Sequence, residues 1–148
     1  MGKATEKGEI IILIAEDDAG HALLIRKNLA RYGIDNRVMH FVDGQKLLDF
    51  FIHPSPDGGD DVYDRDARYV LLLDIRMPKM DGIEVLRRIK SMDHLRDIPV
   101  IMVTTTEDPV DVERSFSSGC SGYVTKPINY KKLLEALEAT GLFELPGR

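Results

Sequence analysis

Runs of consecutive apolar residues alternate along the chain with segments in which apolar residues recur at helical spacing. Three runs are long, Ile10–Ile14, Tyr69–Leu73 and Ile98–Val103, and two are weaker or shorter, Ile34–Phe41 and Gly122–Thr125. An unbroken apolar run of this length is typical of a strand that is covered on both faces. The pattern therefore predicts five strands, most of them buried inside a domain.

The segments that follow these runs predict helices, because their apolar residues lie three or four positions apart and face one side. Residues suited to cap the N-terminus of such helices are Asp18, Asp43, Asp81, Asp108 (before Pro109) and Asn129. The predicted apolar faces consist of Ala22, Ile25 and Leu29; Leu47, Leu48 and Phe51; Val85, Leu86 and Ile89; and Leu133, Leu134 and Leu137. Gly33 and Gly119 are placed to end the first and fourth helices.

Strict alternation of strand and helix predicts the fold class. Five strand–helix pairs with right-handed crossovers form a doubly wound, five-stranded parallel sheet with helices on both faces, an α/β fold of the (βα)5 type. Residues 53–68 interrupt the alternation with two prolines, two glycines and five aspartates, and are predicted to be a surface loop insertion. We expect a flexible segment at 1–8, one domain at 9–140 and a tail at 141–148.

Composition narrows the function classes. A chain of 148 residues predicts one domain without a separate output domain, and a net charge of −5 argues against a general nucleic-acid-binding surface. Cys120 is the single cysteine, which fits a reducing compartment and a buried small residue rather than a redox sensor. No apolar run is long enough to span a bilayer. We therefore expect a cytoplasmic protein with no membrane partner.

Five polar residues follow the predicted strands: Glu16 and Asp17 after the first, Asp74 after the third, Thr104 after the fourth and Lys126 after the fifth. In an open parallel sheet, ligands bind at the carboxyl ends of the strands. Carboxylates about 4 Å apart repel by about 4 kcal/mol per pair at an effective dielectric constant of about 20, and Mg²⁺ relieves such repulsion. The residues therefore predict a Mg²⁺-dependent phosphoryl acceptor in which an aspartate is the nucleophile.

The motifs around these residues resemble those of receiver domains, the phosphoacceptor modules of two-component response regulators. The motifs are IIILIAEDD at 10–18, LDIRMPKMDG at 73–82, VTT at 103–105 and GCSGYVTKP at 119–127. The similarity covers roughly residues 9–140, and the order and spacing of the motifs agree as well. It implies a flavodoxin-like receiver fold with strand order 2-1-3-4-5.

The resemblance implies a role for each acidic position. Asp74 would accept the phosphoryl group from a phosphohistidine of a sensor histidine kinase. Glu16 and Asp17 would hold Mg²⁺ together with Asp74, and the backbone carbonyl of Arg76 would complete the protein ligands. Many receivers have Asp where this chain has Glu16, and many others have Glu, so metal binding remains the expectation.

The resemblance also implies a switch. Lys126 would pair with the phosphoryl oxygens, and the peptide bond between Lys126 and Pro127 would be cis. Thr104 would swing toward the phosphoryl group, and Tyr123 would turn inward into the vacated space. This local electrostatic event would be communicated through the fourth helix and fifth strand as a change in partner binding.

The long insertion before the third strand, the Asp-Ile-Pro sequence before the fourth strand and the tail are similar to single-domain regulators of phytochrome-type histidine kinases. The expected function is a stand-alone response regulator in a phosphorelay, which is no enzyme beyond its own phosphorylation and dephosphorylation. Its expected partners are such a kinase and an unknown downstream protein. Apolar tail residues, Leu142, Phe143 and Leu145, would either pack on the domain or form a homodimer.

Several alternatives share parts of these patterns. A phosphatase of the haloacid-dehalogenase type also uses an aspartate nucleophile, but it needs a second Asp at the position of Arg76. A receiver that works without phosphorylation would not need the complete residue set. The aspartates of 57–66 lack the glycine and glutamate of a calcium loop. His21 follows the acid cluster by one turn, and we expect it to be a surface residue of the helix because Mg²⁺ prefers oxygen ligands.

Overall fold

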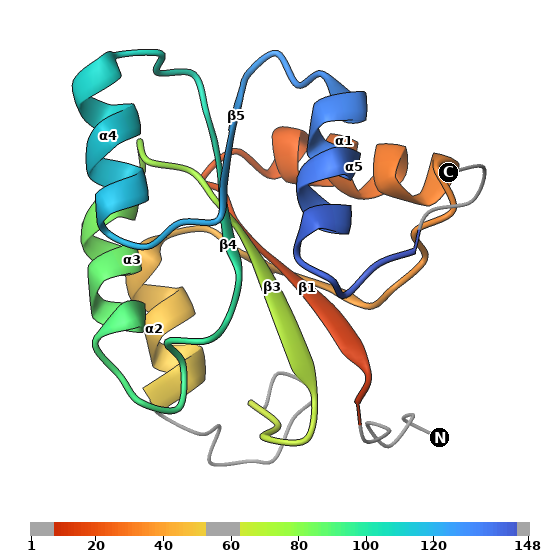
Figure 1. Ribbon diagram of the computed structural model, residues 1–148, viewed down its shortest axis with the longest axis horizontal. Coiled ribbons are helices and arrows are strands. Elements are labelled where there is room, and N and C mark those ends of the chain that lie inside the picture. Colours follow the sequence, from red (N-terminus) through yellow and green to blue (C-terminus); the bar gives the residue numbers. More distant parts are fainter. Residues whose placement is uncertain (1–7, 53–62, 145–148) are drawn as a thin grey trace.

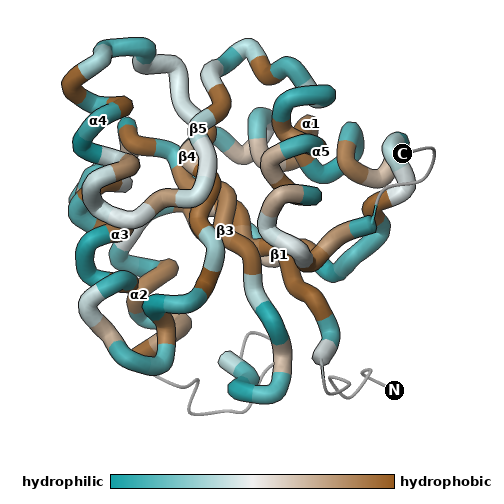
Figure 2. The backbone as a smooth tube through the Cα atoms, viewed as in Figure 1, coloured by the Kyte–Doolittle hydropathy of each residue, from teal (hydrophilic) through white to brown (hydrophobic). Residues whose placement is uncertain are grey.

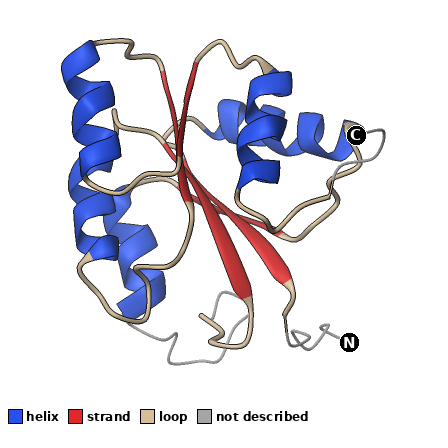
Figure 3. Cartoon of the chain, in the orientation of Figure 1, coloured by secondary structure: helices blue, strands red, loops and turns tan. Residues whose placement is uncertain are grey.

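Five parallel strands form one sheet in the order β2-β1-β3-β4-β5, as predicted. We describe residues 8–52 and 63–144 of a computed structural model. The strands are β1 (Ile10–Ala15), β2 (Val38–Phe41), β3 (Arg68–Leu73), β4 (Val100–Thr104) and β5 (Gly122–Thr125). They run through the middle of the molecule (Figure 3).

Helices cover both faces of the sheet, which confirms the doubly wound α/β fold (Figure 1). One face carries α1 (Ala19–Arg31) and α5 (Tyr130–Ala139), and the other carries α2 (Gly44–Ile52), α3 (Gly82–Lys90) and α4 (Pro109–Ser117). Side chains of Asp18, Asp81, Asp108 and Asn129 accept hydrogen bonds from backbone N–H groups at the starts of their helices, as the capping pattern predicts. Among the described residues, none of the helices has the length and apolarity to cross a bilayer.

The core consists of two layers, one on each side of the sheet. Successive side chains of a strand point to opposite faces, so Ile11 and Leu13 pack in one layer while Ile12 and Ile14 pack in the other. Burial of each such side chain stabilises the fold by about 1.5–3 kcal/mol. Figure 2 shows the apolar strands inside and the polar outer surfaces of the helices. This core holds the carboxyl ends of the strands in fixed positions.

Three strands begin at other residues than the apolar runs indicate. The amide of Ile34 bonds to the carbonyl of Leu29 at the end of α1, so β2 starts only at Val38. The amide of Ile98 similarly bonds to Leu95 O in a turn, and β4 starts at Val100. In these two places a helix end or a turn takes the backbone donor that a strand would need.

The third difference lies at the end of the predicted loop insertion 53–68. Arg68 is already the first residue of β3, because its amide donates to the carbonyl of Glu9 and so extends the pairing with β1. Gly8 belongs to the folded part as well, since it bonds through its amide to Asp66 O and through its carbonyl to the Arg68 guanidinium. Residues 1–7, for which flexibility was predicted, and loop residues 53–62 lie outside the described residues.

The start of the predicted tail is part of the core. Phe143 is only 9% exposed and packs with the layer under α1 and α5, and Leu142 is partly buried against the same layer. Of the two roles predicted for the apolar tail residues, packing on the domain therefore holds for these two. Leu145 lies outside the described residues.

An aromatic cluster, which the sequence patterns did not predict, holds the segment before β3. Tyr63 stacks on Tyr69 with ring centroids 5.4 Å apart, and both contact Phe50 and Phe51 of α2 edge-on. The Tyr69 hydroxyl also accepts a hydrogen bond from the Asp64 amide. Such ring pairs contribute about 0.5–1.5 kcal/mol beyond their area burial, so they fix the return of the chain into the sheet.

Candidate functional site

Three carboxylates meet at the carboxyl ends of β1 and β3. Glu16 and Asp17 follow β1 and Asp74 follows β3, and the two strands pair in parallel so that Ala15 lies beside Leu73. One carboxylate oxygen from each of the three acids can be chosen so that all lie within 4.8 Å of one another. Glu16 and Asp74 are buried, whereas Asp17 is exposed. The sheet therefore brings together the three acids that the sequence predicts as metal ligands.

Lys126 neutralises part of this charge. Its Nζ donates to Asp74 Oδ2 at 3.0 Å and to Glu16 Oε1, and its side chain is only 10% exposed. Burial by itself would lower the pKa of Lys126, but the hydrogen bonds to Glu16 and Asp74 outweigh it, and the pKa lies above its ordinary value. The ammonium therefore stays charged between the two carboxylates.

The surroundings of Glu16 disfavour its charged form. Burial raises its pKa, the bonds from Lys126 and from the Asp18 amide (3.1 Å to Oε2) offset only part of this, and the nearby charge of Asp74 raises it further. A buried carboxylate with a raised pKa gains stabilisation when an additional cation approaches. The donor set contains only oxygen and includes an exposed carboxylate, so the residues fit a hard divalent cation such as Mg²⁺.

Asp18 and His21, which lie near Glu16, belong to the start of α1. Asp18 accepts hydrogen bonds from the amides of Gly20 (2.8 Å) and His21 (3.1 Å), which confirms it as a helix-start residue. The His21 side chain is more than half exposed, as expected for a surface helix residue, and its Nδ1 lies 4.0 Å from Glu16 Oε1.

Gly82 is required for the local geometry at Asp74, and sequence reasoning noted it only as part of a motif. A Cβ atom at this position would lie 2.2 Å from the Asp74 carbonyl oxygen, which is a severe clash. The Gly82 amide donates to Ile75 O at 2.8 Å, and the Arg76 amide donates to Asp74 Oδ1 at 3.1 Å. The close approach of α3 thereby holds the segment that carries the Asp74 carboxylate.

Thr104 reaches the site from β4, beside Lys126. The Lys126 amide donates to the Thr104 carbonyl at 2.8 Å, so the two predicted residues are neighbours. The Thr104 side chain is fully buried, and its hydroxyl has no hydrogen-bond partner among the described residues. Because nearly all buried hydroxyls are paired, an unpaired one is a donor whose acceptor is still missing.

Tyr123 from β5 is bound to the loop that follows Thr104. Its hydroxyl donates to the Thr106 carbonyl at 2.8 Å, and the ring is partly buried against the core layer under α2 and α3. Burial raises the pKa of Tyr123, and so does the nearby charge of Asp111, so the phenol stays protonated and able to donate. The next turn contains the Lys126–Pro127 peptide bond, which is cis.

Sequence reasoning missed Asp111 of α4. Its Oδ2 accepts a hydrogen bond from Thr106 Oγ1 at 3.1 Å and lies 3.9 Å from Arg76 Nη2, while its Oδ1 lies 3.8 Å from Arg114 Nη1. In the sequence Asp111 is an ordinary acid in the first turn of a helix. The Thr106 contact comes from the loop directly before α4, whereas the Arg76 contact joins segments that are distant in sequence and that no local pattern reveals.

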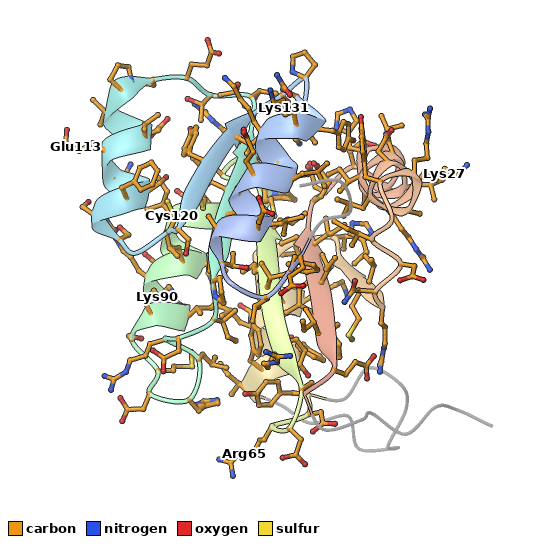
Figure 4. The ribbon with its side chains drawn as sticks, turned by 45° about the vertical axis from the view of Figure 1, so that its right-hand side comes forward. Lys27, Arg65, Lys90, Glu113, Cys120 and Lys131 are labelled. Carbon is orange, nitrogen blue, oxygen red and sulfur yellow. The ribbon has the colours of Figure 1, made fainter. Side chains whose placement is uncertain are left out.

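Cys120 lies apart from these groups, on the chain between α4 and β5 (Figure 4). Its side chain is buried, as predicted, and burial raises the pKa of its thiol to about 11. At neutral pH almost no reactive thiolate is present, which agrees with a structural residue rather than a redox sensor.

Comparisons with known proteins agree with the resemblance to receiver domains. Residues 12–138 match the sequence model of the response regulator receiver domain. The chain is 37% identical over 129 residues to the probable methanogenesis regulatory protein FilR2 of Methanothrix harundinacea, which covers 86% of this chain and 79% of that protein. It is 31% identical over 136 residues to the response regulator Rcp1 of Synechocystis sp., covering 91% of this chain and 88% of Rcp1.

Solved structures show the same relationship. The bacteriophytochrome response regulator AtBRR superposes with a TM-score of 0.74 at 30% identity, covering 97% of this chain and all of that one (100%). The Mn²⁺-bound form of Rcp1 superposes with a TM-score of 0.70 at 29% identity, covering 93% of this chain and 96% of that one. Similarity therefore extends over nearly the whole chain, in sequence and in structure.

Proposed function

The chain belongs to the family of response regulator receiver domains, and from this premise we propose that it is a phosphoryl-accepting switch with Asp74 as the acceptor. Receiver domains of this kind interact with histidine kinases. The observation that carries the proposal is the arrangement of Asp74 beside Lys126, Glu16 and Asp17 at one end of the sheet. An acceptor, a fixed cation and a set of carboxylates that fits a metal are all present there.

The proposed reaction is one phosphoryl transfer followed by one hydrolysis. A carboxylate oxygen of Asp74 attacks the phosphorus of a phosphohistidine, and the nitrogen–phosphorus bond breaks with its electron pair left on the imidazole. The product is an acyl phosphate on Asp74. Attack of water on the phosphorus later breaks the bond to the carboxylate, releases inorganic phosphate and restores Asp74.

Mg²⁺ would be held by the carboxylates of Glu16, Asp17 and Asp74 and by the backbone carbonyl of Arg76. When bound, it would supply positive charge next to the phosphoryl oxygens. This role is supported by the all-oxygen cluster and by the Mn²⁺-bound form of the similar protein Rcp1.

Lys126 and Thr104 are the proposed phosphoryl-binding groups of the chain itself. The Lys126 ammonium, now bound to Asp74 Oδ2, can exchange this carboxylate oxygen for a phosphoryl oxygen without losing a charged partner. The unpaired Thr104 hydroxyl can donate its proton to a second phosphoryl oxygen. Movement of Thr104 would give Tyr123 room to turn inward, and this movement is the proposed output signal.

The proposed partners are proteins. A phytochrome-type sensor histidine kinase as donor is supported by the similarity to AtBRR, a bacteriophytochrome response regulator. We also propose a cytoplasmic, stand-alone regulator, and the similarity to Rcp1 over 88% of its length supports the stand-alone part. The downstream protein, or a second copy of this chain, would read the change at β5 and α4.

The test is phosphorylation by a small donor. We expect acetyl phosphate with Mg²⁺ to add one phosphoryl group to the wild type in intact mass spectra, and little without Mg²⁺. The Asp74→Asn variant should gain none, while Asp81→Asn, which changes a helix-capping acid of the same loop, should still gain it. Absence of the gain in the wild type, or its persistence in Asp74→Asn, would refute the proposal. Continuous hydrolysis of phosphate esters without a lasting mass gain would instead indicate a phosphatase.

A further inference from the structure

Thr106, in the loop between β4 and α4, is held from three directions. Its hydroxyl donates to Asp111 Oδ2 at 3.1 Å and accepts a hydrogen bond from the Asp108 amide at 3.2 Å. Its carbonyl accepts from the Tyr123 hydroxyl at 2.8 Å. Thr106 therefore links the loop to the N-terminal turn of α4 and to β5.

Asp111 is the residue on which these links converge. Its side chain is only 17% exposed and is surrounded by the Thr106 hydroxyl and the guanidinium groups of Arg76 and Arg114. The Arg76 side chain is 70% exposed and 3.9 Å away, so this ion pair is the weaker link. The hydrogen bond to Thr106 joins two partly buried groups and is the stronger link.

The chain is short between these contacts and the proposed site. Thr106 lies two residues after Thr104, whose hydroxyl is buried without a partner. Arg76 lies two residues after Asp74, and its amide donates to Asp74 Oδ1 at 3.1 Å. A backbone shift that carries Thr104 toward a group on Asp74 would also displace Thr106 and its hydrogen bonds to Asp111 and to the Asp108 amide.

We propose that Asp111 is a positioning residue that locks residues 104–106 in the unphosphorylated arrangement, so that Thr104 reaches a phosphoryl group only when the contact between Asp111 and Thr106 opens. The inference rests on the proposed phosphoryl acceptance at Asp74 and adds a control element to it. Release of Asp111 also frees the first turn of α4, because the same Thr106 hydroxyl bonds to the Asp108 amide there. The lock thus couples the site to a helix on the surface.

The test compares variants that open the lock with one that leaves it intact. Asp111→Ala removes the acceptor, and Thr106→Val removes the hydroxyl while keeping the shape of the side chain. Glu113→Ala serves as the control, because Glu113 is an exposed acid of the same helix and points away from the molecule (Figure 4). All variants are measured as the full chain, and urea unfolding shows that they are folded.

If opening the lock raises the fraction of molecules in which Thr104 can reach a phosphoryl group, the rate of phosphoryl uptake rises in proportion to that fraction. We expect both lock variants to take up a phosphoryl group from acetyl phosphate and Mg²⁺ about threefold faster or more than the wild type, and Glu113→Ala to match the wild type. In the free proteins, NMR relaxation dispersion at the amides of Thr104, Thr105 and Tyr123 should increase in the lock variants. A purely structural role of Asp111 would alter stability without this gain in rate.

The two readouts separate failure of the lock from failure of the proposed function. Normal uptake by the wild type with an unchanged or slower rate in both lock variants overturns the lock and leaves phosphoryl acceptance standing. No uptake by the wild type overturns the proposed function, and the lock is then decided by the dispersion in the free variants. Unchanged dispersion at Thr104 and Thr105 in both variants contradicts the lock in either case.

Discussion

The ammonium of Lys126 lies 3.0 Å from Asp74 Oδ2, although 52 positions separate the two residues in the chain. The same ammonium donates to Glu16, so one cation serves two buried carboxylates. We propose two roles for this pair. Lys126 would compensate the buried carboxylates in the protein without a metal, and it would keep the proposed acceptor beside a proposed phosphoryl-binding group.

Removal of this cation should destabilise the metal-free protein. Lys126→Met leaves Glu16 and Asp74 buried together without compensation, and we expect a loss of about 2–4 kcal/mol in the free energy of unfolding. Urea denaturation at neutral pH measures it, and added Mg²⁺ should restore part of the loss. Lys131→Met, at an exposed position of α5, is the control and should change little. Equal stability of the two variants would show that Lys126 does not compensate the carboxylates.

Asp17, the exposed member of the acid cluster, should contribute to Mg²⁺ binding but not to the stability of the metal-free protein. Mg²⁺ at about ten times its Kd should raise the free energy of unfolding of the wild type by about 1.4 kcal/mol. Asp17→Asn should lose this gain but keep the metal-free stability, because the side chain is exposed.

Asp35→Asn, a change of an exposed acid in the turn after α1, is the matched control for metal binding and should respond to Mg²⁺ like the wild type. Thermal or urea unfolding with and without the cation provides all these values. Full retention of the Mg²⁺ effect in Asp17→Asn would remove this residue from the ligand set.

Two buried hydroxyls should respond to deletion in opposite directions. The Thr104 hydroxyl has no partner among the described residues, so Thr104→Val should raise the free energy of unfolding by about 1 kcal/mol. The Ser115 hydroxyl donates to the Asp111 carbonyl at 2.8 Å, so Ser115→Ala should lower it by about 1 kcal/mol. Urea denaturation of the unphosphorylated proteins compares them. A loss of stability in Thr104→Val would mean that its hydroxyl is bonded in solution.

Asp43 should make stability depend on pH in the acid range. Its Oδ1 accepts a hydrogen bond from the Lys46 amide at 2.8 Å and its Oδ2 lies 3.5 Å from Lys79 Nζ. The hydrogen bond from the Lys46 amide, aided by Lys79, holds the pKa of Asp43 below its ordinary 3.8. For an acid with a lowered pKa, the stabilisation is complete above the unfolded value and is lost as the pH falls through the folded value.

Asp43→Ala should therefore cost about 1–2 kcal/mol at neutral pH, and the cost should shrink as the pH drops below 3.8. Urea denaturation of Asp43→Ala and of the wild type, at neutral pH and again below pH 3.8, measures the difference in their free energies of unfolding. Asp35→Ala, a change of an exposed acid in the loop after α1, is the control. A cost that stays constant with pH would assign the effect to packing rather than to charge.

The sequence alone determined the order of elements and most of the proposed site. Apolar periodicity and helix caps depend on neighbouring residues, so they can be read locally. Once the alternation predicted a parallel sheet, its carboxyl ends had to bring Glu16, Asp17 and Asp74 to one edge with Thr104 and Lys126. The receiver motifs predicted the same residues from family resemblance, and the family is shown by the match over residues 12–138.

Only the tertiary structure decided which groups have partners. The ammonium of Lys126 joins Glu16 and Asp74, and Asp111 lies near Arg76, so both contacts connect residues that are distant in sequence. The Thr104 hydroxyl is buried where it has no partner among the described residues. The starts of β2 and β4 were missed for a related reason, since a helix end or a turn takes the backbone donors of Ile34 and Ile98. Contacts between distant residues depend on distances across the packed core, and the bonds of Ile34 and Ile98 depend on the local backbone geometry of a helix end and a turn; a periodic apolar pattern contains neither.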